Sequence, residues 1–197
     1  MRLLSLTEQA GWLNGHQLPA APYEHGGEDF KFYLQFYPPK TFRSIECFTE
    51  VLLGYAAAGG EAMVTVIDTV MPYDYEGRFF NKVRAAPGQT TSIAETPGHL
   101  FGASELPDLI PLFSLTVGWQ WQAYLHLPGT RTVLLNWEGD IFDLWTDDHA
   151  VFSGASEMLK SFGLSKTGAA QRDASPSADL AGSPGNSAAG GELPPGS

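Results

Sequence analysis

Residues 115–145 constrain the fold more strongly than any other part of the chain. This stretch contains four of the five tryptophans, together with two turn signals, Pro-Gly at 128–129 and Glu-Gly at 138–139. Glycine in a short loop between apolar runs is typical of a β-hairpin, because it accepts the positive φ that tight hairpin turns need. We therefore expect a three-stranded antiparallel meander over residues 116–146.

The second hairpin of this meander is predicted to turn on residues 138–139 alone. A two-residue loop places Leu135 opposite Phe142 and Val133 opposite Leu144. Directly opposed residues point to the same side of a sheet, so these four side chains share one apolar face.

Burial then predicts the register of the first hairpin. A two-residue loop exposes Trp119 and Trp121, whereas a three- or five-residue loop places both on the apolar face. A slip of one residue exchanges the faces, and each large buried side chain contributes roughly 1.5–3 kcal/mol. We therefore predict an odd loop. The apolar face then carries Trp119, Trp121, Ala123, Leu125, Val133, Leu135, Trp137, Phe142 and Leu144, and the opposite face carries Gln120, Gln122, Tyr124, His126, Asn136, Asp143 and Trp145.

Local signals place further elements around the meander. Ser5 and Glu8 form a capping box, and Thr41 or Ser44 is suited to cap a longer helix with an apolar stripe. Strict alternation and β-branched residues predict strands, whereas residues 71–103 give no clear pattern. The expected elements are a helix at 6–14, a strand at 30–37, a helix at about 43–58, a strand at 62–70 and a final helix at about 154–162, capped by Ser153.

The fold class follows from these elements. The strand at 30–37, the long helix (about 43–58) and the strand at 62–70 fit either a parallel right-handed unit or a helix laid across an antiparallel sheet. In both cases we expect a single α+β domain over residues 1–164. Its mixed or antiparallel sheet of about five strands includes the 116–146 meander and is packed by the long helix and by short N- and C-terminal helices.

Residues 165–197 differ in composition from the rest of the chain. Of these 33 residues, 23 are Gly, Ala, Ser or Pro, and none is aromatic. Such a segment buries too little apolar area to offset an ordering entropy of roughly 1–2 kcal/mol per residue. We expect a disordered tail.

Composition narrows the class of protein. With 197 residues and 43% apolar residues the chain can form a sizeable core, and it has no apolar run of about 20 residues. Glu8 comes too early for the apolar region of a signal peptide, so we expect a cytoplasmic protein without membrane contact. Cys47 is the only cysteine, which excludes an intrachain disulfide and a cysteine-based zinc site.

The net charge of −11 bears on the choice of partner. A negative field repels nucleic acid and favours cations or basic proteins, although solubility alone explains most such charges. We therefore expect no nucleic-acid binding, and we consider a basic protein as a partner. The oligomeric state is left open.

The acids at 138–148 are the strongest local candidates for a site. Carboxylates suit Mg²⁺ or Ca²⁺, but the segment lacks the glycine and the closing glutamate of an EF-hand loop. We therefore predict neither a metal site nor a cofactor, and interpret the segment as a solvated acidic edge with Trp145 as an aromatic anchor for a partner. The predicted binding residues are Trp145, Asp143, Asp147, Asp148, His149, Tyr124 and His126.

No recognised catalytic motif is present, which favours a non-catalytic protein. The main hypothesis is a protein-binding module that uses its acidic surface, for example an inhibitor or immunity-like protein that masks a basic partner. One alternative is a hydrolase-like or cation-assisted enzyme, with His99 as general base or with the acids of 138–149. Another is a small-ligand pocket on the sheet, lined by Trp119, Trp121 and the aromatic residues of 73–84.

Overall fold

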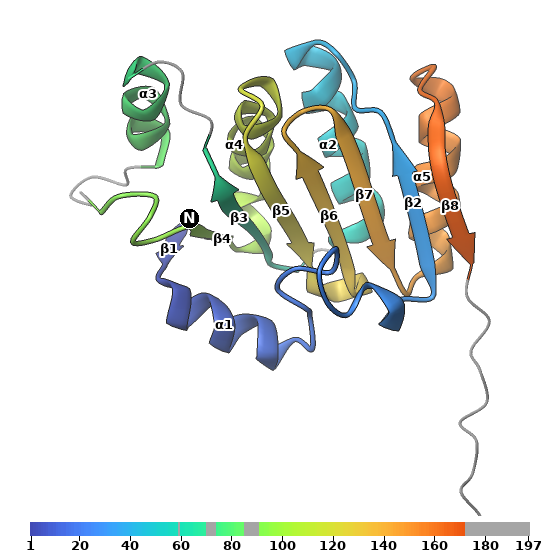
Figure 1. Cartoon of the computed structure of the whole chain (residues 1–197), viewed down its shortest axis with the longest axis horizontal. Helices are drawn as coiled ribbons and strands as arrows, with labels where there is room; N and C mark the ends of the chain where they lie inside the picture. The colour runs from blue at the N-terminus through green and yellow to red at the C-terminus, as the bar shows by residue number, and fades with distance from the viewer. Residues whose placement is uncertain (59, 70–73, 85–90, 172–197) are drawn as a thin grey trace, which may run out of the picture.

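The computed structural model describes residues 1–58, 60–69, 74–84 and 91–171. Within these residues the strands form one eight-stranded sheet in which every neighbouring pair is antiparallel (Figure 1). Across the sheet the order is β1 (Arg2–Leu4), β4 (Gly98–Phe101), β3 (Ala62–Asp68), β5 (Gln122–Leu127), β6 (Thr132–Trp137), β7 (Ile141–Thr146), β2 (Phe32–Phe36) and β8 (Lys166–Gln171).

The expected meander is present and occupies the centre of this sheet. Strands β5, β6 and β7 are consecutive neighbours. They lie between β3 and β2, so the two strands that flank the long helix in sequence are separated by three others. This topology resolves the two arrangements left open by the sequence, because the helix crosses over the meander and no parallel pair forms among the described strands.

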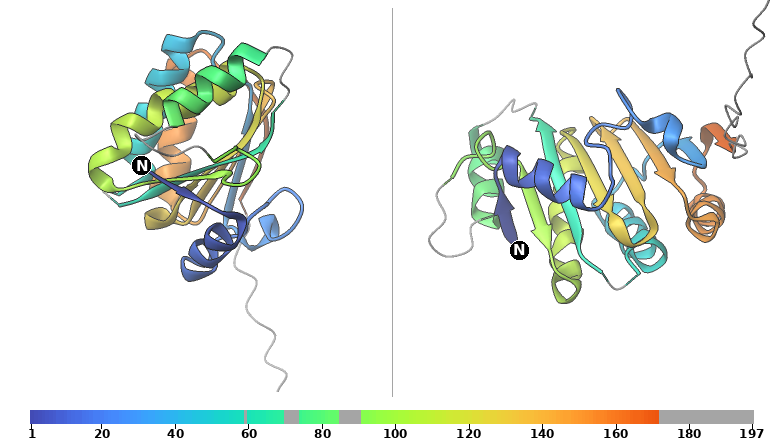
Figure 2. Two further views of the ribbon diagram at one scale, coloured as in Figure 1. Left: turned by 90° about the vertical axis from the view of Figure 1, so that its left-hand side faces the viewer. Right: turned by 90° about the horizontal axis from the view of Figure 1, so that it is seen from below.

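Helices cover both faces of the sheet (Figure 2). Helices α2, α4 and α5 lie on one face, with α3 beside α4, and we call this the helix face. Helix α1 and the loop that follows it lie on the other face, which we call the α1 face. The helices are α1 (Leu6–Gly15), α2 (Phe42–Ala56), α3 (Asp74–Arg84), α4 (Leu106–Gly118) and α5 (His149–Ser161).

Each face has its own apolar cluster. On the helix face the core includes Phe48, Phe113 and Phe142, which pack ring against ring. On the α1 face a smaller cluster contains Tyr124 and Trp145 of the meander. The meander is therefore buried from both sides, which the sequence analysis did not anticipate.

Both predicted loop lengths in the meander are wrong. The first loop has four residues, because Leu127 pairs with Thr132, and the second has three, because Trp137 pairs with Ile141. The predicted faces are therefore reversed in β6, whereas in β5 and β7 the faces predicted for residues 123–126 and 142–145 are confirmed. The helix face carries Ala123, Leu125, Leu127, Leu134, Asn136, Phe142 and Leu144, and the α1 face carries Tyr124, His126, Val133, Leu135, Trp137, Asp143 and Trp145.

The three-residue loop has a local cause. Glu138 and Gly139 both have positive φ, and the side chain of Asn136 accepts a hydrogen bond from the Gly139 N–H at 3.0 Å. A Cβ on Gly139 would lie 2.6 Å from the carbonyl oxygen of Val117, so only glycine fits against the end of α4. The two tryptophans assigned to the first strand lie outside it, because Trp119 caps α4 and Trp121 precedes β5.

Helix α4 spans 13 residues although it contains two prolines, one at its first turn and one inside it. It continues through Pro111, whose ring lies on the exposed side of the helix. Proline removes one backbone hydrogen bond from a helix. Here the buried face of α4, with Leu112, Phe113 and Val117 packed in the core, outweighs that loss.

The sheet also extends beyond the predicted domain end at residue 164. Strand β8 pairs with β2 although it lies in the segment predicted to be disordered. Its residues are partly or fully exposed, so backbone pairing with a free sheet edge explains the strand better than side-chain burial does. Residues 172–197, the rest of the predicted tail, lie outside the described residues.

Candidate binding cavity

A cavity of about 730 Å³ lies on the α1 face, between α1, the loop after it and the sheet. Its volume is within the range of about 300–1,000 Å³ that small-molecule sites occupy. The lining comes from six segments that are distant in sequence. It consists of Leu6, Gln9, Ala20, Ala21, Glu24, Thr65, Val66, Ile67, Asp68, Thr69, Asn81, Ser92, Ile93, Ala94, Pro97, Gln122 and Tyr124.

The floor of the cavity is a cross-strand row on the sheet. Thr65 of β3 pairs with Tyr124 of β5 on one side and with Gly98 of β4 on the other. A Cβ on Gly98 would lie 3.1 Å from Leu4 Cβ and 3.4 Å from Gln9 Oε1. The missing side chain at Gly98 therefore lets α1 approach the sheet and brings Gln9 over the row.

A β-bulge shapes the mouth of the cavity. Val66 pairs with Ala123, but the next pairing is Asp68 with Gln122, so Ile67 is the extra residue. A bulge bends its strand and redirects the side chains next to it. It places the side chains of Ile67 and Asp68 at the exposed rim.

Two buried polar atoms at the cavity have no hydrogen-bond partner in the described part of the chain. They are Oε1 of Gln9 and Oγ1 of Thr65, in residues that are only 7% and 5% exposed. A buried polar atom without a partner costs roughly 1–3 kcal/mol. Both residues line the cavity, so both atoms are placed where a bound molecule can complete their hydrogen bonds.

Negative charge reaches the cavity from two carboxylates, those of Glu24 and Asp68. Burial raises the pKa of Tyr124 to about 12; the Tyr23 backbone opposes this rise, whereas the charges of Glu24 and Asp143 add to it. No Lys, Arg or His side chain is among the residues that line the cavity. The cavity therefore combines apolar walls with a negative field.

A buried arginine holds one wall in place. Arg84, at the end of α3, donates to the Thr96 carbonyl and hydroxyl oxygens, to the Thr91 carbonyl oxygen and to Asn81 Oδ1. Its Nε donates to Nε2 of His99 at 2.7 Å. Burial lowers the pKa of Arg84 to about 10. These neutral acceptors tie α3, the 91–97 wall and β4 together.

His99, the candidate general base, has no free ring nitrogen. Its Nε2 accepts the hydrogen bond from Arg84, so Nδ1 carries the proton and faces the Val64 carbonyl oxygen at 3.2 Å. Burial, reinforced by the Arg84 charge, lowers the pKa of His99 to about 3. The imidazole is therefore neutral, and its two hydrogen bonds connect Arg84 of α3 to Val64 of β3.

Asp143, one of the predicted binding residues, is buried rather than exposed. It accepts hydrogen bonds from the Tyr33 hydroxyl at 2.6 Å and from Gln35 Nε2 at 2.9 Å. Burial, with the contact to Asp143, raises the pKa of the Tyr33 hydroxyl well above its ordinary range. Both partners come from β2, so this carboxylate links β7 to β2.

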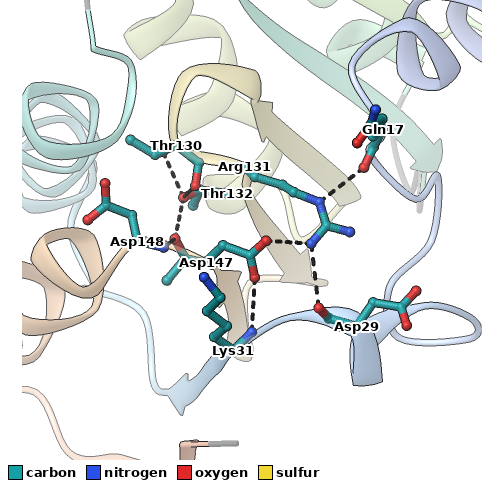
Figure 3. Close-up of polar contacts among 9 residues, drawn as sticks. Gln17, Asp29, Lys31, Thr130, Arg131, Thr132, Asp147 and Asp148 are labelled. Carbon is teal, nitrogen blue, oxygen red and sulfur yellow. Dashed lines mark hydrogen bonds and ion pairs between the residues drawn. The ribbon is translucent and has the colours of Figure 1, made fainter. Parts of the chain in front are cut away.

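Asp147 and Asp148 are also engaged in internal contacts (Figure 3). Asp147 accepts from the Lys31 backbone N–H at 3.0 Å and forms an ion pair with Arg131 at 2.5 Å. Arg131 also donates to the Gln17 carbonyl oxygen and lies over the Phe30 ring. Asp148 caps α5 through the N–H groups at 150 and 151, in place of the predicted Ser153 cap.

The four other predicted residues differ in their surroundings. Tyr124 lines the large cavity, and Trp145, only 4% exposed, lines a smaller one of about 190 Å³. His149 is exposed and packs against the Phe32 ring. His126 is fully buried, and neither ring nitrogen makes a hydrogen bond of good geometry in the described chain. The predicted set is therefore distributed over several places and does not form one exposed edge.

Of the aromatic residues proposed to line a sheet pocket, Phe79, Phe80, Trp119 and Trp121 pack against one another, Tyr75 is exposed, and Tyr73 lies outside the described residues. Phe80 lies 4.7 Å from Trp121, and Trp119 lies 5.2 Å from Trp121, between ring centroids. Apart from Tyr124, the residues that line the cavity, above all Gln9 and Thr65, were not predicted from the sequence. In the sequence, only Gly98 marks the site. A glycine there indicates a close approach of another element, but the sequence alone does not show that this element is α1.

Among the described residues, no helix has the length and apolar character needed to cross a membrane. The same residues contain no group of three or more His, Cys, Asp or Glu side chains placed to hold a metal ion. Comparison with family models, with curated proteins and with solved structures finds no match to this chain.

Proposed function

We propose that this protein is a non-catalytic binding module that holds a small, largely apolar molecule in the cavity between α1 and the sheet. The observation that carries the proposal is a pair of buried atoms, Gln9 Oε1 and Thr65 Oγ1, which lack a hydrogen-bond partner among the described residues and lie on the lining of a cavity of about 730 Å³. Ligand sites typically combine apolar walls with a few polar groups that orient the ligand. This cavity has both.

The chemistry of the lining favours binding over catalysis. Neither histidine nor cysteine is among the lining residues, and the Ser92 hydroxyl donates to Glu95 at 3.0 Å. A nucleophilic serine needs a neighbouring base that removes its proton. Glu95 instead accepts from both the backbone and the side chain of Ser92, as in a capping turn.

Titration with 4-ethylphenol, followed by amide NMR shifts, tests the proposal. We expect saturable shifts at Thr65, Ala94 and Gln122, which line the cavity. Ala94→Phe introduces a bulky ring at the wall and is expected to abolish these shifts. Ala10→Phe, at an exposed position of α1 outside the lining, is the matched control. If the shifts are absent, or survive Ala94→Phe in a folded protein, the proposal fails.

A second proposal, docking of a basic protein, rests on the net charge of −11. Of the acids at 138–148, the carboxylates of Glu138 and Asp140 in the β6–β7 turn form no hydrogen bond or ion pair within the described residues, and Asp140 is exposed. Electrostatic docking weakens as salt increases. Binding of cytochrome c, a basic protein, should therefore weaken on Glu138→Lys with Asp140→Lys more than on Glu46→Lys. Equal losses would exclude this turn as the docking edge.

A further inference from the structure

The charged groups at the cavity all have the same sign. Among the described residues that line the cavity, only Glu24 and Asp68 are charged, and both are exposed at the rim. Neither carboxylate has an ion-pair partner among the described residues. Segments 70–73 and 85–90, which lie outside the described residues, contain no Lys, Arg or His. The chain therefore offers these carboxylates no nearby cation from those segments.

Arg84, which is buried, does not neutralise them. The N–H groups of Arg84 are directed at His99, Asn81 and the 91–96 segment. Its guanidinium therefore faces neutral oxygens and a ring nitrogen, and it is not part of the cavity lining. An anionic ligand would meet two carboxylates at the rim without an opposing cation, whereas a cationic ligand would be attracted to both.

The deep end of the cavity favours a hydrogen-bond donor. Oε1 of Gln9 is an acceptor only, and the Thr65 hydroxyl can donate or accept. Both atoms are buried and unpartnered within the described chain. A ligand hydroxyl that donates to Gln9 and exchanges a hydrogen bond with Thr65 satisfies both. The apolar residues that line the cavity include Ala21, Ile93 and Pro97.

We infer that the cavity is selective for an organic ammonium ion with an apolar body and a hydroxyl at its far end. The ammonium group lies between Glu24 and Asp68, the body lies on the apolar wall, and the hydroxyl reaches Gln9 and Thr65. This inference rests on the proposed function, because it names the chemical class that the same cavity takes. Tyramine has this arrangement of groups and serves as the probe.

A matched set of four probes separates the contributions of the two ends. Tyramine carries both groups, phenethylamine lacks the hydroxyl, 4-ethylphenol lacks the ammonium, and 3-(4-hydroxyphenyl)propionate replaces the ammonium by a carboxylate. We expect tyramine to bind about tenfold more tightly than 4-ethylphenol, since two partly exposed ion pairs supply about that factor. The propionate should bind most weakly, and added salt should reduce the advantage of tyramine.

Variants assign each contribution to its residue. Glu24→Gln combined with Asp68→Asn should remove most of the preference for tyramine over 4-ethylphenol. Glu46→Gln, on α2 and therefore on the helix face, is the matched control and should leave that preference unchanged. Gln9→Leu should reduce the preference for tyramine over phenethylamine and should not change the preference for a cation.

The possible outcomes separate the two proposals. If none of the four probes binds saturably, the cavity is not a ligand site and the proposed function itself fails. If 4-ethylphenol or the propionate binds as tightly as tyramine, the cavity binds ligands but the inferred cation selectivity is wrong. If the selectivity survives the double carboxylate variant, the ammonium does not lie between Glu24 and Asp68, and the inference is overturned.

Discussion

The two faces of the sheet are both buried, but they are built in different ways. On the helix face, large apolar side chains from α2, α4 and α5 fill the space and the aromatic rings contact one another. On the α1 face, one short helix and a loop cover the sheet, and cavities remain beneath them. A face covered by fewer and less regular elements leaves room that a second molecule can use.

The buried polar groups of the two faces differ in how completely they are hydrogen-bonded. On the helix face, Arg84, His99 and Asn136 are buried with their hydrogen bonds formed. Of the five buried side-chain atoms that lack a partner in the described chain, four belong to Gln9, Thr65 and His126 on the α1 face. Since unpaired buried polar atoms are costly, we read the helix face as structural and the α1 face as the face adapted to binding.

Removing one tryptophan from each face is the strongest test of whether both faces stabilise the fold. Trp121, on the helix side, is 0% exposed and Trp145, on the α1 face, is 4% exposed. We expect Trp121→Ala and Trp145→Ala each to lower the free energy of unfolding by about 3–5 kcal/mol. Urea unfolding measures both, with Trp137→Ala, at 36% exposed, as the milder control. A loss near zero for Trp145→Ala would show that α1 and its loop do not cover the sheet in solution.

The secondary structure shows which parts of the fold local sequence patterns can predict. The predicted helices at 6–14 and 43–58 and the predicted strand at 62–70 are confirmed to within about two residues. Capping boxes and apolar periodicity are local, so they are visible in the sequence. The predicted register of the meander was wrong because it assumed that only one face of the sheet is buried. The register depends on the cover over the second face, which is formed by α1 and by the loop that follows it.

The candidate site was even less predictable from local sequence patterns than the strand register. Gln9 and Thr65 are 56 positions apart, and each alone is an ordinary polar residue. They come together because Gly98 lies between them and allows α1 to approach the sheet. The short strands β1, β4 and β8 were not predicted either, because their stability comes from pairing with partners that are distant in sequence. Long-range contacts of this kind are not encoded in any local pattern.

Acid should destabilise the protein partly through His126 on the α1 face. Burial lowers its pKa to about 4, with the carbonyl groups of residues 19, 20 and 63 opposing the shift, whereas an unfolded histidine has a pKa near 6.5. The unfolded state therefore binds a proton first. The stabilising contribution of the neutral ring is complete above pH 6.5 and is lost, on the order of 3 kcal/mol in total, as the pH falls to about 4.

His126→Leu tests this contribution, because leucine cannot titrate. We expect a flatter dependence of the free energy of unfolding on pH between 6.5 and 4, measured by urea unfolding across that range. His149→Gln, a change at an exposed histidine, should retain the full slope. Equal slopes for the wild type and His126→Leu would show that His126 is not kept neutral by burial. The α1 face would then be more open to water than the structure indicates.

The contacts of Arg131 hold the loop of the α1 face against the meander. They join Asp147, the Gln17 carbonyl oxygen and the Phe30 ring. We expect Arg131→Met to cost about 1–2 kcal/mol and to accelerate amide hydrogen exchange in residues 17–30. Exchange in α2, on the opposite face, should be unchanged. Uniform acceleration over both faces would mean that the loop does not open on its own and unfolds only with the whole protein.

The smallest expected effect compares one unpartnered hydroxyl on each side of the sheet. The Ser114 hydroxyl of α4 and the Thr65 hydroxyl are both buried and lack a hydrogen-bond partner in the described residues. Ser114→Ala and Thr65→Val should each change the free energy of unfolding by no more than about 1 kcal/mol. Only Thr65→Val should weaken tyramine binding, by about threefold, because one net hydrogen bond is worth about that factor. The same NMR titration measures both variants. An equal effect of Ser114→Ala on binding would mean that the Thr65 hydroxyl acts through the stability of the fold and not through contact with the ligand.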